Sequence, residues 1–167
     1  VPVGKQLAAL AGAHMKRVTM ELGGHSPVLV FDDADVERAA EMLAKFKVRN
    51  AGQVCVSPTR FYVQEGAYEQ FLARFSDVLK NIKVGDGLEA GTDMGPLAHE
   101  RRVPAMSAFI DDAKKHGGKV VVGGGPLDRK GFFFAPTVVT DLPDDSMLMT
   151  EEPFGPVSYT HLRAHET

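Results

Sequence analysis

Cysteine is almost absent from this 167-residue chain, which contains only Cys55. A single thiol cannot form an internal disulfide, so we expect a reducing, cytoplasmic environment. Basic residues are not in excess either, since 19 Lys and Arg stand against 22 Asp and Glu for a net charge of −3. Nucleic acids and anionic membrane surfaces bind basic patches, so we expect neither as a partner.

Long apolar runs are missing as well. No stretch approaches the roughly 18 apolar residues that a membrane helix needs, and the first residues lack the charged-then-apolar order of a signal peptide. The chain has no internal repeat, and 44% of its residues are hydrophobic. This composition is typical of a globular domain with one sizeable core.

Helical and strand patterns alternate along the chain. The spacing of apolar residues predicts helices over residues 5–15, 36–49, 68–82 and 101–116. An acidic run at residues 32–35 supplies an N-cap for the second of these helices. Apolar and β-branched runs predict strands over residues 17–22, 26–31, 59–63, 119–122 and 132–139. This alternation predicts an α/β layered fold with mainly parallel strands.

Three short segments carry residues that could perform chemistry. The first is residues 50–55 (NAGQVC), in which the only cysteine follows a glycine in a turn after a long helix. Free cysteine is often buried and structural. A reactive nucleophile with room around it is the other interpretation, and this segment alone leaves both open.

The second segment is residues 21–24 (ELGG), in which Glu21 precedes two residues without side chains. The glycines let the backbone approach a ligand, and the carboxylate could serve as a general base beside a reactive cysteine. Taken alone, a solvated glutamate before a glycine turn is the simpler interpretation.

The third segment is residues 151–156 (EEPFGP), where two prolines fix a stiff, non-helical loop. Adjacent acids are usually solvated, although a carboxylate beside an aromatic side chain could also bind a ribose. The glycine runs at 85–87 and 123–125 match no phosphate-binding fingerprint. His161 and His165 lack the glutamate that a zinc-protease pattern requires after the first histidine, so we expect no metal site.

Taken together, these segments resemble the aldehyde dehydrogenase superfamily. Residues 20–27 (MELGGHSP) are similar to its glutamate signature, residues 50–55 to its cysteine signature, and residues 151–157 (EEPFGPV) to its Glu-Glu-x-Phe-Gly-Pro loop. Their order and separations also suit the family. The resemblance covers about residues 1–157 and implies an aldehyde dehydrogenase-like layered fold, truncated here.

The resemblance also implies a division of the chain. Residues 1–24 would be the C-terminal end of a dinucleotide-binding domain, and residues 25–157 an incomplete catalytic domain. Residues 158–167 depart from the family pattern, and we expect them not to be native coding sequence. An independently sequenced locus with the same ten residues would contradict that expectation. Because most of the cofactor domain is not in these residues, we expect the isolated chain to be inactive.

Two residues would carry the reaction that the resemblance implies. Cys55 would attack an aldehyde, forming a thiohemiacetal and then a thioester, and its backbone N–H would help to hold the oxyanion. Glu21 would activate the water that hydrolyses the thioester. The product would be a carboxylic acid.

The resemblance implies NAD or NADP as the cofactor. Glu152 would bind the hydroxyls of the nicotinamide ribose, and Phe154 would pack near the nicotinamide. The backbone of Leu22 and Gly23 would lie against the carboxamide region. Gly4 matches the second glycine of the family's Gly-Ser-x-x-x-Gly turn, which opens the helix under the cofactor phosphates.

The substrate implied is a small aldehyde, and the full-length protein would be a homo-oligomer, a dimer or tetramer. Arg49 stands six residues before Cys55, where relatives similar to succinate-semialdehyde dehydrogenases have an arginine that meets a substrate carboxylate. Arg49 could instead simply end a helix, where a cation suits the dipole. A CoA-acylating relative and a non-catalytic structural homologue are the alternative functions. The Glu21 setting favours hydrolysis, and the presence of both Cys55 and Glu21 favours catalysis.

Overall fold

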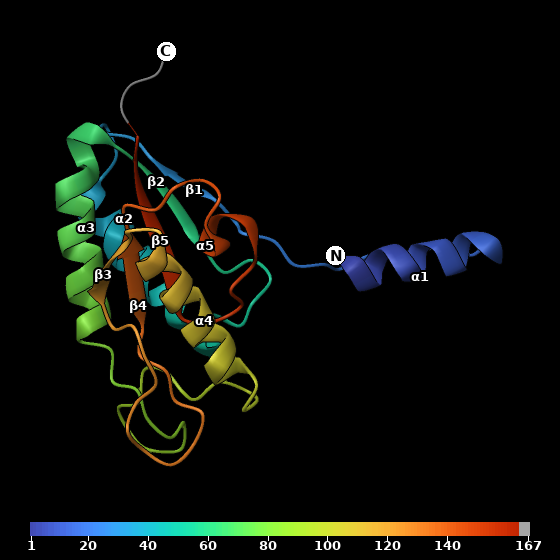
Figure 1. Cartoon of the computed structure of the whole chain (residues 1–167). Coiled ribbons are helices and arrows are strands. Elements are labelled where there is room, and N and C mark those ends of the chain that lie inside the picture. Colours follow the sequence, from blue (N-terminus) through green and yellow to red (C-terminus); the bar gives the residue numbers. More distant parts are fainter. Residues whose placement is uncertain (164–167) are drawn as a thin grey trace.

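The computed structural model describes residues 1–163 and shows helices and strands that alternate around one five-stranded sheet (Figure 1). In chain order, the elements are α1 (Pro2–Ala13), β1 (Val28–Val30), α2 (Val36–Val48), a short 3₁₀ helix η1 (Arg49–Gly52), β2 (Arg60–Gln64), α3 (Glu65–Lys80), α4 (Arg102–Lys115), β3 (Lys119–Val122), β4 (Thr137–Thr140), α5 (Met147–Thr150) and β5 (Val157–Arg163).

The strands of the sheet are in the order β1-β2-β5-β4-β3. All neighbours are parallel except β3, which runs antiparallel to β4 at one edge. In the register, Phe61 of β2 lies between Val28 of β1 and Thr160 of β5. All four residues of β4 are buried, and Figure 1 shows α3 and α4 on opposite sides of the sheet. The mostly parallel sheet between helices confirms the predicted α/β layered fold.

An aromatic cluster joins β2 to α3 in the core. The ring of Phe61 lies 4.8 Å from that of Phe75 and 5.8 Å from that of Phe71, and all three side chains are fully buried. Burial of each large apolar side chain contributes about 1.5–3 kcal/mol. Helix α2 packs against α3, and Asp35 caps its first turn by accepting a hydrogen bond from the Arg38 N–H at 3.2 Å. This packing fixes the end of α2, where the candidate site begins.

Most of the predicted elements are confirmed, and the exceptions have physical causes. Residues 17–22 form no strand, because no other strand of the described chain pairs with them. The strand predicted over residues 132–139 is limited to β4, since Pro136 directly before it has no N–H for a ladder. Helix α5 and strand β5 were not predicted.

Strand β5 also changes the interpretation of the chain's last part. Residues 158–163 continue β5 between β2 and β4, so the sequence break expected at Ser158 is no break in the fold. Residues 164–167 of the expected tail lie outside the described residues.

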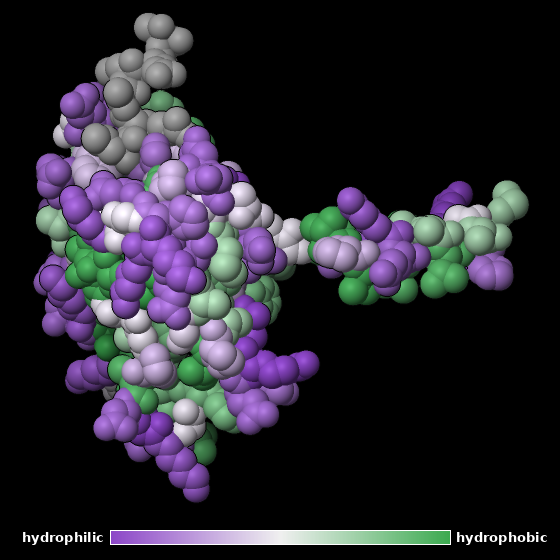
Figure 2. Space-filling view, in the orientation of Figure 1, coloured by the Kyte–Doolittle hydropathy of each residue, from purple (hydrophilic) through white to green (hydrophobic). Residues whose placement is uncertain are grey.

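Helix α1 extends away from the body of the molecule (Figure 1). Gly4 is its only buried residue, and Leu7 and Leu10 are 51% and 59% exposed. Figure 2 shows hydrophobic residues on the surface of this helix. Leu29 and Phe31, at the β1 edge of the sheet, are also more than half exposed. Among the described residues, no helix is both long and apolar enough to span a membrane.

Candidate active site

The loop that carries Cys55 starts with a sharp turn at the end of α2. Asn50, Ala51 and Gly52 adopt left-handed backbone conformations, with φ angles of 50°, 54° and 70°. Such conformations are costly for residues with a Cβ and persist where the surroundings fix them. Cys55 follows three residues later, and its side chain is exposed.

Two amide side chains hold this turn in place. The Asn50 side chain donates to the Gln53 carbonyl at 3.0 Å, and the Gln53 side chain donates back to the Asn50 carbonyl at 3.0 Å. The Gln53 side-chain oxygen also accepts from the Ala98 N–H at 3.0 Å. Within the described part of the chain, the N–H of Cys55 makes no hydrogen bond. That N–H is therefore available to an incoming oxygen atom.

The segment that carries Glu21 reaches the cysteine loop through Ser26. The Ser26 hydroxyl donates to the Cys55 carbonyl at 3.3 Å. Glu21 itself is exposed, and its carboxylate makes no hydrogen bond or ion pair among residues 1–163. The structure thus brings the two segments together without joining the Glu21 carboxylate to the Cys55 sulfur.

Gly23 and Glu152, predicted from separate motifs, lie in direct contact. A Cβ placed on Gly23 would lie 1.8 Å from Oε2 of Glu152, so the carboxylate occupies the space that a side chain would fill. Leu22 reaches Gly4 of α1, since a Cβ on Gly4 would lie 2.8 Å from Cδ1 of Leu22. A carboxylate over exposed glycine backbone suits a ligand that presents hydroxyl groups, such as a ribose.

The loop at residues 151–156 packs directly on the cysteine loop. A Cβ on Gly52 would lie 2.1 Å from the Gly155 carbonyl oxygen, so only glycine allows the two backbones to approach this closely. Phe154, between Glu152 and this contact, has a left-handed φ of 43° and is 37% exposed. The loop therefore presents Glu152 and Phe154 beside the loop that carries Cys55.

Two basic residues that the sequence analysis missed, Lys47 and Arg102, interact electrostatically with Glu152. The ammonium of Lys47 is buried and donates to the hydroxyls of Ser57 and Thr59, each at 3.5 Å. Burial lowers the pKa of Lys47 to about 7, partly opposed by the negative charge of Glu152. Burial also lowers the pKa of Arg102, and Glu152 again acts in the opposite direction.

His25 is a third titratable group beside the cysteine loop. Burial lowers its pKa, and the positive charges of Arg60 and Lys47 lower it further, which favours the neutral form of the ring. Neither ring nitrogen has a hydrogen-bond partner within the described chain.

The sequence contained one signal for Lys47. This residue lies on the buried face of α2, next to Val48 and three residues after Ala44.

Arg49 is the C-cap of α2 and the first residue of η1. Its side chain is exposed and makes no hydrogen bond or ion pair within the described residues. The position is compatible with the helix-ending interpretation, and the guanidinium is also accessible to a ligand.

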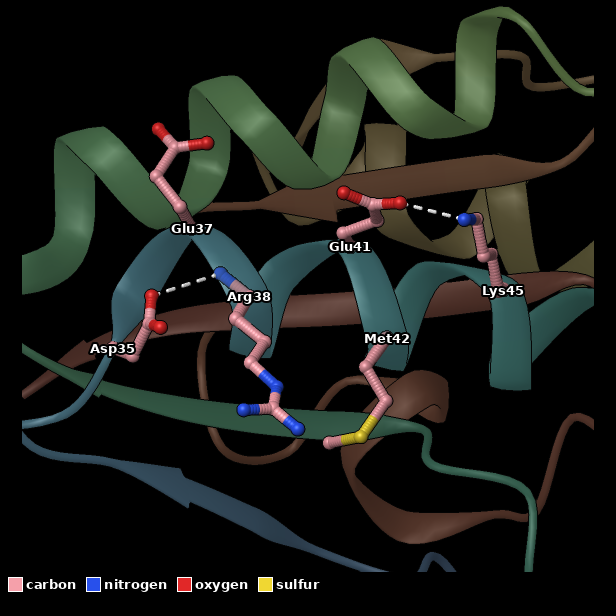
Figure 3. Close-up of a pocket in the computed structure, with 6 residues that line it drawn as sticks. All are labelled: Asp35, Glu37, Arg38, Glu41, Met42 and Lys45. Atoms are coloured by element: carbon pink, nitrogen blue, oxygen red, sulfur yellow. Dashed lines mark hydrogen bonds and ion pairs between the residues drawn. The ribbon is translucent and has the colours of Figure 1, made fainter.

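A hollow on the outer side of α2 contains none of the predicted site residues (Figure 3). In Figure 3, Arg38 and Met42 extend to one side of the helix, and Glu37 and Glu41 lie toward α3. Glu41 pairs with Lys45 at 2.6 Å. Glu41 also pairs with Arg74 of α3 at 2.8 Å. Such exposed ion pairs are typical of a solvated face. The hollow is lined by Asp35, Glu37, Arg38, Glu41, Met42 and Lys45.

The arrangement can support nucleophilic chemistry at an exposed thiol. Cys55 has an accessible side chain and a free backbone donor, and a carboxylate-bearing segment meets its loop through Ser26. Among the described residues, no group of three His, Cys, Asp or Glu side chains could hold a metal ion.

Residues 1–162 match the model of the aldehyde dehydrogenase family. The chain is 44% identical over 158 residues to 4-(hydroxymethyl)benzenesulfonate dehydrogenase TsaD1 of Comamonas testosteroni, a match that covers 95% of this chain and 33% of that protein. It is 41% identical over 156 residues to the NADP(+) succinate-semialdehyde dehydrogenase GabD of Escherichia coli, covering 93% of this chain and 32% of that protein. The chain thus spans about a third of the length of these relatives.

A solved structure described as an E. coli NADP-dependent enzyme has the same fold. It superposes with a TM-score of 0.91 at 39% identity, covering 99% of this chain and 34% of that one. The family match also extends past residue 157, where the sequence pattern alone predicted the likeness to end.

Proposed function

The chain belongs to the aldehyde dehydrogenase family, and we propose that it forms the cysteine-bearing part of an enzyme that oxidises an aldehyde to a carboxylic acid with NAD or NADP. The observation that carries this proposal is the meeting of three segments that are far apart in the sequence. Ser26 ties the Glu21 segment to the Cys55 loop, and Glu152 lies on Gly23 of the same segment.

Cys55 is the proposed nucleophile. Its Sγ attacks the aldehyde carbon, a C–S bond forms, and the carbonyl oxygen becomes the oxyanion of a thiohemiacetal. The free N–H of Cys55 donates a hydrogen bond to that oxyanion, which favours the step. When bound, the cofactor would supply the hydride acceptor for the former aldehyde carbon, and Cys55 would then hold the acyl group as a thioester.

Glu21 is the proposed general base of the second half-reaction. Its carboxylate takes a proton from water, which attacks the thioester; the carboxylic acid leaves and the Cys55 thiolate is restored. Glu21 lies in an extended segment ahead of two glycines and has no partner within the described chain. Its side chain is therefore free to turn toward the cysteine loop.

The residues present fit a dinucleotide. Gly23 leaves room that the Glu152 carboxylate fills, and that carboxylate would hold the hydroxyls of the nicotinamide ribose. Phe154, partly exposed on the same loop, would cover the nicotinamide. Leu22 would line the carboxamide region, and Gly4 lies in contact with it at the start of α1.

The proposed substrate carries an anionic group besides the aldehyde. The two relatives above are named for a sulfonate and for a semialdehyde of succinate, both of which carry a negative charge at neutral pH. Arg49, exposed at the end of α2 and close in sequence to Cys55, is the proposed partner of that anion.

A chimera provides the test of activity. In it, the 156 residues of this chain that match GabD replace the corresponding third of the E. coli protein. We expect aldehyde-dependent reduction of NADP without added coenzyme A, and its loss in the Cys55→Ser variant. Turnover that requires coenzyme A would instead indicate the acylating alternative. No turnover in a folded chimera would favour the non-catalytic homologue.

Replacement of Arg49 tests the substrate class. Loss of a charge-assisted contact of about 1.5–3 kcal/mol raises a dissociation constant by about 10- to 100-fold. We therefore expect Arg49→Met to raise the KM for succinate semialdehyde by at least about tenfold, with little change for butanal. Equal changes for both aldehydes would rule out a role for Arg49 in anion recognition. The homo-oligomer and the cytoplasmic location stay predictions.

A further inference from the structure

Arg102, a residue outside the three signatures, places its guanidinium on the loop at residues 151–156. We propose that Arg102 is a positioning residue that fixes the conformation of this loop and thereby keeps the Glu152 carboxylate on Gly23. The inference rests on the proposed role of Glu152 in cofactor binding. It assigns to Arg102 no contact with substrate or cofactor.

The loop has little support of its own. Pro153 and Pro156 have no N–H to donate, and residues 151–156 belong to no helix or strand. Phe154 is held at a φ of 43°, a conformation that is unfavourable for a bulky side chain. Such a backbone persists only where its surroundings determine it.

Arg102 holds the backbone of the loop at Phe154, the residue with the unfavourable conformation. Its Nη2 donates to the carbonyl of Pro153 and, at 3.2 Å, to the carbonyl of Phe154. These two carbonyls belong to the peptide groups on either side of the Phe154 Cα. Rotation of those two peptide groups is what φ and ψ of Phe154 describe. One charged donor on both carbonyls therefore fixes the backbone of Phe154, two residues after Glu152.

Helix α4 provides a rigid base for this clamp. Arg102 is its first residue, and Met106, one turn later, packs against the next residue of the loop, since a Cβ on Gly155 would lie 2.2 Å from the Met106 sulfur. Phe109 and Ile110 anchor the helix in the core, where both are buried. The loop is thus held at two successive points by one well-packed element.

Arg101 offers a matched control. It precedes Arg102 by one residue and carries the same charge, yet it is exposed and its side chain makes no hydrogen bond or ion pair within the described residues. Loss of charge near α4 is therefore the same in the two alanine variants, and only Arg102→Ala removes the bonds to the loop.

The first test measures chymotrypsin cleavage of the 167-residue chain after Phe154. Leu88, which is 96% exposed, is the reference site in the same digest, and the buried Phe61 reports unfolding. We expect Arg102→Ala to raise cleavage at Phe154 relative to Leu88 by about tenfold, and Arg101→Ala to leave it unchanged. Equal cleavage in both variants would overturn the proposal.

A conservative variant is used if Arg102→Ala unfolds the chain, so that chymotrypsin also cleaves after Phe61. Arg102→Lys keeps the charge and a donor, but its ammonium lies one bond closer to the backbone than Nη2 of arginine, so it does not reach both carbonyls in the same way. We expect it to increase cleavage at Phe154 and not at Phe61. A cleavage rate at Phe154 equal to that of Arg101→Ala would then overturn the proposal.

The second test is kinetic and uses the chimera. We expect Arg102→Ala to raise the KM for NADP by about tenfold, while kcat and the KM for the aldehyde change by less than about threefold. Arg101→Ala should keep the parent values. An unchanged KM for NADP in Arg102→Ala would overturn the proposal. If the parent chimera does not reduce NADP at all, the proposed function fails, and the cleavage ratio still decides whether Arg102 holds the loop.

Discussion

Gly23→Ala should weaken cofactor binding at the candidate site without destabilising the fold. A Cβ at this position would lie 1.8 Å from Oε2, 2.7 Å from Cδ and 2.9 Å from Oε1 of Glu152. Ordinary contact begins at 3.4 Å, so the carboxylate must move by about 1.6 Å. The group that moves is the far end of a flexible side chain, and the φ of Gly23 is not in the left-handed region. The fold can therefore adapt to the alanine.

The expected rise in the KM for NADP follows from this displacement of the Glu152 carboxylate. Carboxylate hydrogen bonds of about 1.5–3 kcal/mol to the ribose would be lost, which corresponds to a rise of about 10- to 100-fold in the KM for NADP. The free energy of unfolding should change by less than about 1 kcal/mol, because alanine also restricts the unfolded chain.

Gly24→Ala is the control for this variant. A Cβ on Gly24 would meet no atom within 4 Å, so its KM for NADP should stay at the parent value in the chimera. If Gly23→Ala acts through Glu152, the double variant with Glu152→Gln should have no larger effect than either single one. Equal KM values for the two glycine variants would refute the assigned contact between Gly23 and Glu152.

Two further predictions concern stability in the 167-residue chain. The folded-state pKa of Lys47, about 7, lies below its usual value of 10.5, so between these pH values only the unfolded chain holds the proton, and stability rises with pH. Lys47→Met should reduce the difference between the free energies of unfolding at pH 6 and pH 9, measured by urea unfolding. An unchanged difference would contradict the lowered pKa of Lys47. Gly52→Ala should cost more than about 2 kcal/mol, because its Cβ would lie 2.1 Å from a backbone oxygen of Gly155 at a φ of 70°. Gly91→Ala, with a φ of 84° and open space, should cost only about 1 kcal/mol, and equal losses would contradict the close approach.

Local signals were sufficient to predict the elements that lead to the site. The N-cap at Asp35 and the apolar spacing after it define α2 without reference to any distant residue. The three signatures could be recognised because each is continuous in sequence. In the structure these segments meet at Gly23 and Glu152 and at Gly52 and Gly155, while the roles that the resemblance implies for their residues stay predictions.

Strand β5 could not be predicted because its stability comes from distant partners. Its polar residues suggest a surface tail, yet Ser158 and Tyr159 are fully buried between two parallel neighbours. The Ser158 hydroxyl donates to the Thr137 carbonyl at 3.0 Å, and the Tyr159 hydroxyl donates to the Leu142 carbonyl at 2.9 Å. Buried polar groups are tolerated when they are satisfied in this way, and sequence does not reveal such partners.

The same limit applies to the supporting residues of the site. Arg102 lies 51 residues before Pro153, whose carbonyl it binds, and no motif links the two. Lys47 was hidden among the charged residues of α2, where only its buried position distinguishes it from Lys45. Long-range packing, which local patterns do not encode, determines both placements.

Mass spectrometry of the Glu21→Gln chimera tests the central claim most directly. With the proposed general base removed, a single turnover with succinate semialdehyde and NADP should leave a succinyl group on the peptide that contains Cys55. The adduct should require both aldehyde and cofactor, and it should be absent in the Glu21→Gln/Cys55→Ser double variant. Reduction of NADP without any acyl group on Cys55, together with activity retained in Cys55→Ser, would contradict the proposed cysteine mechanism.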